Sequence, residues 1–91
     1  MIKTIDSLQD VKSFVRTIVK EGVNFHPDDD FNDMINFENK LQFYSESEAA
    51  ERNRINEQCF EYCELNDLDY YSIALEIFNK ETGLKDYKPN A

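Results

Sequence analysis

The sequence predicts an all-α fold, an antiparallel three-helix bundle with a short extra helix and a loop between the first and second long helices. Three observations support this prediction. Apolar residues recur at helical spacing in three long segments, a capping side chain precedes each segment, and turn residues follow it. A chain of 91 residues suits a single small helical domain, residues 1–91, and short connections favour antiparallel neighbours.

The first helix is predicted over residues 8–21. Ser7 can cap its start, because a serine hydroxyl accepts a free backbone N–H there, and Asp10 occupies the third helical position of such a cap. Gly22 is expected to end the helix in the left-handed conformation. The apolar residues that follow the helical period are Leu8, Val11, Phe14, Val15, Ile18 and Val19.

A short helix is predicted next, over residues 27–35, with Phe25 packing back on the core. Pro27 suits a first helical turn, and the aspartates after it lie where the helix dipole favours anions. Residues 36–44 allow two interpretations. We prefer an irregular loop, and the alternative is a small hairpin that pairs residues 35–37 with 41–43, which would be marginal without packing support.

The second long helix is predicted over residues 45–65, where Ser45 and Glu48 form a capping box. Arg52 and Asn56 fall in the middle of its otherwise mainly apolar face. In one interpretation Arg52 extends its charged head to water and Asn56 bonds a loop carbonyl. In the other, both line a polar pocket that receives an acidic side chain or a ligand, and we predict that Arg52 contacts a carboxylate of residues 28–33.

The last helix is predicted over residues 70–82, with Asp69 as its cap and Gly83 after its end. Its apolar residues cover a wider arc than the roughly 100° stripe that one neighbouring helix requires. The helix is therefore either sandwiched within the domain or partly available to a partner. A homodimer is one hypothesis, with contacts through Tyr70, Tyr71, Ala74 or Phe78.

The net charge of −9 is unevenly distributed, because residues 24–48 carry seven acidic side chains and one lysine. Direct binding to nucleic acid or to an anionic membrane surface is not expected, since both require a basic surface. The N-terminus has no apolar run typical of a signal peptide, and no segment has the length and apolarity of a membrane span.

Two cysteines, Cys59 and Cys63, lie four residues apart on one face of the second long helix. That spacing is unsuited to a disulfide within an intact helix, so we expect free thiols and a cytoplasmic protein. Thiols on a core face are inert, the chain has a single histidine, His26, and neither glycine belongs to a phosphate-binding loop. We therefore expect neither catalytic activity nor a cofactor.

A calcium loop is the nearest match to a metal motif. Asp28, Asp30 and Asn32 occupy its first, third and fifth positions. Asp33 and Asn39 stand where that motif requires glycine and glutamate. The sequence therefore predicts no metal site, and acidic capping of a short helix accounts for the aspartates.

The predicted function is that of a small acidic interaction or regulatory module that binds another protein, whose surface could be basic. The expected partner-binding residues are His26, Asp28, Asp29, Asp30 and Asp33. One alternative is a small-ligand or divalent-metal-binding protein that uses residues 26–33 together with Arg52 and Asn56. A second alternative is an acidic mimic of nucleic acid.

Overall fold

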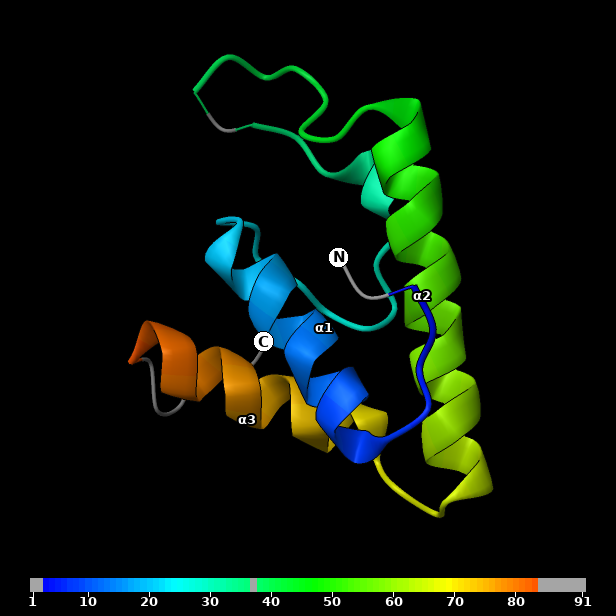
Figure 1. The fold of residues 1–91 in the computed structure, drawn as a ribbon. Helices are drawn as coiled ribbons and strands as arrows, with labels where there is room; N and C mark the ends of the chain where they lie inside the picture. Colours follow the sequence, from blue (N-terminus) through cyan, green and yellow to red (C-terminus); the bar gives the residue numbers. More distant parts are fainter. Residues whose placement is uncertain (1–2, 37, 84–91) are drawn as a thin grey trace.

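Helix α2 (Glu46–Leu65) is the longest element of the fold, and helices α1 (Leu8–Lys20) and α3 (Tyr70–Thr82) lie on one side of it (Figure 1). The structure, a computed structural model, describes residues 3–36 and 38–83. Its helices confirm the predicted all-α fold of three long helices. α1 runs in the direction opposite to α2, and α3 starts near the end of α2 and turns away from it. α3 packs mainly on α1.

The helix ends follow the predicted capping side chains. Ser7 Oγ accepts the backbone N–H of Asp10 at 3.1 Å, and Ser45 and Glu48 form the reciprocal capping box. Asp69 Oδ1 accepts the backbone N–H of Tyr71 at 3.1 Å. Gly22, with φ of 94°, follows α1 in the left-handed region, as predicted.

The core is formed by the apolar faces of the three helices and by an aromatic cluster beside them. Phe14 of α1 meets Phe25 and Phe31 edge to face, with ring centroids 6.1 and 6.2 Å away. Phe31 also meets Tyr44 at 5.7 Å. These rings fill the space between the end of α1 and the first half of α2, so the predicted packing of Phe25 on the core is correct.

The N-terminal segment is held along α2 by two side chains of that helix. Gln58 Oε1 accepts the backbone N–H of Ile5 at 3.0 Å, and Arg54 Nη1 donates to the carbonyl of Lys3 at 3.0 Å. Figure 1 shows this segment running beside α2 before α1 begins. Its backbone groups thereby gain partners without forming a strand.

The predicted helix over residues 27–35 is too long. The structure has a turn at residues 27–28 and a single 3₁₀ turn, η1 (Phe31–Asp33). Acidic side chains accept hydrogen bonds from nearby backbone N–H groups instead. Asp29 Oδ2 accepts the backbone N–H of His26, and Asp30 Oδ1 accepts that of Asn32, both at 2.9 Å. Such local acceptors compete with helical hydrogen bonds, which explains why the helix stays short.

The segment after η1 has no regular strand among the described residues, which agrees with the preferred irregular loop, but its two ends do contact each other. Ile35 and Gln42 form an isolated antiparallel bridge. The N–H of Asn36 donates to the carbonyl of Leu41, and that of Phe43 to the carbonyl of Met34, both at 2.8 Å. The pairing resembles the alternative hairpin, without reaching regular strands among the described residues. Phe37, part of that alternative, lies outside the described residues.

The turn between α2 and α3 places Asp67 in the left-handed region, with φ of 56°. Its N–H donates to the carbonyl of Glu64 at 3.3 Å, and the N–H of Leu68 donates to that of Cys63 at 2.7 Å. This pair of bonds is a Schellman motif, in which glycine is usual at the position of Asp67.

Asp67→Gly should therefore stabilise the protein by about 0.5–1 kcal/mol, because it removes the left-handed strain and an acidic group at a helix C-terminus. Urea denaturation measures the change. Asp67→Ala is the control, since it removes the charge but keeps the strain and should be less stable than Asp67→Gly. A glycine variant less stable than the wild type would contradict this account of the turn.

Candidate partner-binding site

The acidic loop, residues 26–33, is fixed to α2 by two asparagines. Asn56 Nδ2 donates to the carbonyl of Pro27 at 2.8 Å. Asn53 accepts the backbone N–H of Phe31 at 3.0 Å through Oδ1 and donates to Asp30 Oδ1 at 2.9 Å through Nδ2. These bonds join the loop to two consecutive turns of α2, and the buried ring of Phe31 anchors it in the core.

Helix α3 holds the same loop through Tyr71. Its hydroxyl donates to Asp28 Oδ1 at 2.7 Å, and its ring lies 5.6 Å from that of His26, measured between centroids. Within the loop, Nδ1 of His26 accepts the backbone N–H of Asp28 at 3.1 Å. The loop is therefore attached to both α2 and α3.

Four exposed carboxylates of this loop surround a hollow of about 330 Å³, which is lined by Asp28, Asp29, Asp30, Asp33 and Met34. No lysine or arginine is among these lining residues. The backbone N–H of Asn32 and then the side chain of Asn53 hold the pKa of Asp30 below its usual value. We call this surface the acidic hollow. Its geometry suits a cationic group, since four aspartates line one concave surface.

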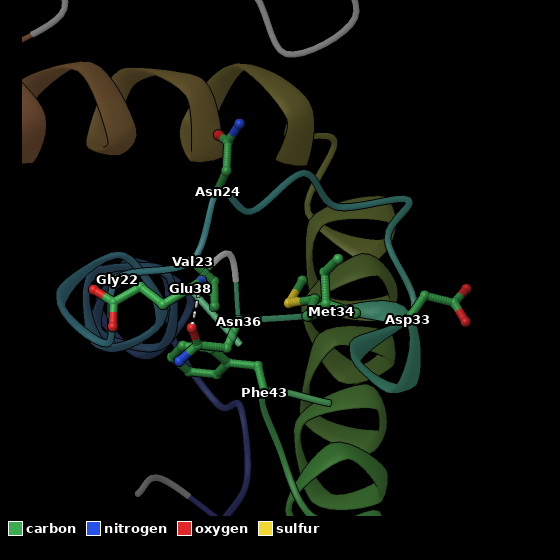
Figure 2. Close-up of a pocket in the computed structure, with 9 residues that line it drawn as sticks. Gly22, Val23, Asn24, Asp33, Met34, Asn36, Glu38 and Phe43 are labelled. Carbon is green, nitrogen blue, oxygen red and sulfur yellow. Dashed lines mark hydrogen bonds between the residues drawn. The ribbon is translucent and has the colours of Figure 1, made fainter. Parts of the chain in front are cut away.

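A second hollow, of about 490 Å³, adjoins the first between the end of α1 and α2 (Figure 2). Its lining comes from residues 22–24, 33–36, 38 and 43. Asp33 and Met34 line both hollows. We call this second surface the apolar hollow, because aliphatic and aromatic side chains contribute much of its wall.

Arg52 does not contact the acidic loop, so that prediction is wrong. Its partner is Glu21 at the C-terminal end of α1, which it meets with two bonds, Nε to Oε1 at 3.1 Å and Nη2 to Oε2 at 2.6 Å. Nη1 donates to the carbonyl of Glu48 at 3.1 Å. Arg52 is 8% exposed, so its head does not extend to water either.

Tyr44 completes this partly buried polar group. The guanidinium carbon of Arg52 lies 4.4 Å from the centroid of the Tyr44 ring, and the Tyr44 hydroxyl donates to Glu21 Oε1 at 2.7 Å. Burial, followed by the bond to Glu21, raises the pKa of Tyr44. We call these three residues the Glu21–Arg52–Tyr44 cluster. An acidic side chain does meet Arg52, but it comes from α1.

Asn56 bonds the loop carbonyl of Pro27, as the first of its two interpretations predicts. Its Oδ1 accepts the hydroxyl of Tyr70 at 2.7 Å. Arg52 and Asn56 thus bind different partners, one at the end of α1 and the other under the acidic loop. Sequence reasoning missed Glu21, Tyr44 and Asn53; only Asn53, one position beyond Arg52 on the same helix, gave a usable signal.

The residues of the proposed self-association surface are mostly inside the fold. Tyr70 and Ala74 are 2% and 3% exposed, and Phe78 is also buried, whereas Tyr71 is 44% exposed. Contacts within the fold, mainly with α1, bury part of the apolar arc of α3, while Ile73 and Leu75 stay half-buried. The four buried residues of the arc therefore face the fold, and the homodimer stays a prediction that has Tyr71 as its exposed residue.

The two cysteines are free and buried. Burial raises the pKa of Cys59 to about 12 and also raises that of Cys63. Thiols in this environment are poor nucleophiles and poor metal ligands. Within residues 3–36 and 38–83, no three histidine, cysteine or acidic side chains are grouped so as to hold a metal ion.

The chain was compared with family models, curated proteins and solved structures, and none of them matches it. None of the helices in the described part of the chain has the length and apolarity needed to cross a membrane.

Arg52→Met should lower the free energy of unfolding by about 1–3 kcal/mol, since Glu21 would remain partly buried without its partner. Glu21→Gln combined with Arg52→Met should recover part of that loss. A double-mutant cycle in urea measures the coupling, which we expect to be about 1–2 kcal/mol. Coupling that is indistinguishable from zero would show that the cluster does not join α1 to α2 energetically.

Alkaline pH should destabilise the fold through Cys59 and Tyr70, which are both neutral when buried. Burial raises the pKa of both groups in the folded state. Their stabilisation is therefore complete below their unfolded-state pKa values, about 8.5 and 10, and is lost as pH rises above them. Each contributes a slope of up to about 1.4 kcal/mol per pH unit. Tyr70→Phe should flatten the dependence of stability on pH above pH 10, and an unchanged slope would contradict this assignment.

Proposed function

We propose that this protein is a small acidic interaction module that binds another protein through the acidic loop, with a basic surface on the partner. The observation that carries the proposal is the acidic hollow, around which Asp28, Asp29, Asp30 and Asp33 present exposed carboxylates. The densest negative charge in the sequence coincides with a concave surface, and that combination favours a cationic partner.

The attachment of the loop to two helices also supports the proposal. Asn53 and Asn56 of α2 and Tyr71 of α3 hold the loop before any partner arrives. A preformed site loses little conformational entropy on binding, so more of the contact energy contributes to affinity.

Internal hydrogen bonds leave the carboxylates able to bind. Hydrogen bonds within the fold engage Oδ1 of Asp28, Oδ2 of Asp29 and Oδ1 of Asp30, and a carboxylate accepts hydrogen bonds on both oxygens. Asp30 keeps its charge because its pKa is lowered by the bonds it accepts. A lysine or arginine of a partner can therefore bind without first breaking the contacts that shape the loop.

The small-ligand or metal alternative has less support. Arg52 is engaged by Glu21, and Asn56 bonds the loop backbone, so neither side chain is directed to a shared pocket with the loop carboxylates.

The test replaces Asp28, Asp29 and Asp30 by Asn, which removes three charges and keeps an acceptor oxygen for the bonds from Tyr71, His26 and Asn32. A protein recovered on the immobilised wild-type chain, then purified, serves as the ligand in calorimetry at several salt concentrations. The triple variant should bind about tenfold more weakly, and the difference should shrink as salt rises.

The matched control replaces the exposed Glu57, Glu61 and Glu64 of α2 by Gln, which makes the same change in net charge elsewhere. That variant should bind like the wild type. If the Asn variant binds normally but melts earlier, the aspartates serve only to shape the turn and the proposal fails. Equal weakening in both variants would reduce the interaction to unspecific attraction by net charge.

A further inference from the structure

We infer that the apolar hollow receives one apolar side chain of the partner segment that binds at the acidic loop, and that lysine or arginine residues flank this side chain. This inference rests on the proposed function and adds the chemical pattern of the ligand, an apolar anchor within a basic segment. Nothing in the composition of the chain alone indicates it, because the hollow forms only when the turn after η1 lies against the end of α1.

The position of the hollow connects it to the proposed interface. Asp33 and Met34 line both hollows, so the two hollows are neighbours on the surface. An extended segment bound over the aspartates can therefore place a neighbouring side chain in the apolar hollow.

The lining of the hollow is mixed, and its apolar part suits an apolar group. Val23, Met34, Ile35 and Phe43 contribute to its wall, and Ile35 is 45% exposed although it is aliphatic. A volume of about 490 Å³ lies within the range of pockets that bind compact organic groups. A leucine or phenylalanine side chain would remove part of this surface from water, which is the usual role of an anchor residue at an interface.

Acidic side chains at the edges of the hollow favour basic residues on either side of the apolar anchor. Figure 2 shows Glu38 on the side of α1 and Asp33 on the opposite side, with the Asp33 carboxylate pointing away from Val23 and Phe43. The described lining contains no lysine or arginine. An apolar residue with basic neighbours matches this arrangement, because those neighbours would extend beyond the hollow toward Glu38 on one side and Asp33 on the other.

A second copy of the same chain is a poorer occupant. Each chain carries a net charge of −9, so self-association at this place would bring acidic surfaces together. A basic segment of a different protein is the occupant that charge complementarity favours.

The test uses three synthetic nonapeptides and nuclear magnetic resonance titration of the full chain. The first has four lysines and a central leucine, the second replaces the leucine by serine, and the third replaces the lysines by glutamates. The leucine peptide should bind at least about tenfold more tightly than the serine peptide, because its anchor is buried. It should also shift the methyl signals of Met34 and Ile35, and the glutamate peptide should not bind.

Ile35→Thr keeps a β-branched side chain in the bridge but makes the wall more polar. It should reduce the affinity for the leucine peptide to nearly that for the serine peptide, and it should leave the serine peptide unaffected. Leu65→Asn is the control, because Leu65 is an apolar residue of α2 that is 85% exposed and does not line the hollow. That variant should bind both lysine peptides like the wild type.

Different outcomes separate this inference from the proposed function. If both lysine peptides bind equally and the Asn variant of the acidic loop weakens both, the anchor hypothesis is wrong while the acidic interface stands. Leucine-dependent shifts located away from Met34 and Ile35 would also overturn the inference.

If neither lysine peptide binds at millimolar concentration, the acidic loop itself is not an interface for basic segments and both proposals fail. If a leucine derivative without basic residues bound as tightly as the leucine peptide, the basic residues would be unnecessary. The hollow would then be a small-molecule pocket, and the inference would be wrong.

Discussion

The ion pair between Glu21 and Arg52 is the contact on which the arrangement of the other elements depends. It joins Glu21, the residue directly after α1, to Arg52 in the first half of α2, and the ring of Tyr44, from the segment before α2, packs on the guanidinium. With the end of α1 fixed at Arg52, the chain that leaves α1 at Gly22 must return by Tyr44 to the same place beside α2. The acidic loop and both hollows lie within that closed length of chain.

Desolvation offsets much of the attraction of this partly buried ion pair, so we expect it to contribute more to the specificity of the arrangement than to stability. The pair of bonds from the guanidinium fork to one carboxylate accepts a narrow range of orientations. An apolar residue in place of Arg52 would fill the volume and still allow α1 to slide along α2. We therefore regard the Glu21–Arg52–Tyr44 cluster as the feature that sets the register of these two helices and so the shape of the hollows.

The helices could be predicted from the sequence because their signals are local. The apolar period of a helix, its capping residue and the residue that ends it all lie within one segment of the sequence. The observed bounds of α3 agree with its predicted range of residues 70–82. The partner of Arg52 could not be predicted in this way. Glu21 is 31 positions distant in the sequence, and local charge density pointed to the aspartates of the acidic loop. Those aspartates already accept hydrogen bonds from their own loop, from Asn53 and from Tyr71, contacts that arise only after the helices dock.

The attachment of the acidic loop to both α2 and α3 has a consequence for the motions of the molecule. Helices α2 and α3 share the least direct packing of the helix pairs, and the loop adds polar links from each of them to one short segment. A ligand held on the loop would therefore reinforce the connection between these two helices, which Tyr70 and Phe60 also join. Occupancy of the loop and protection of α3 amides against hydrogen exchange then become linked quantities, although α3 itself need not touch the ligand.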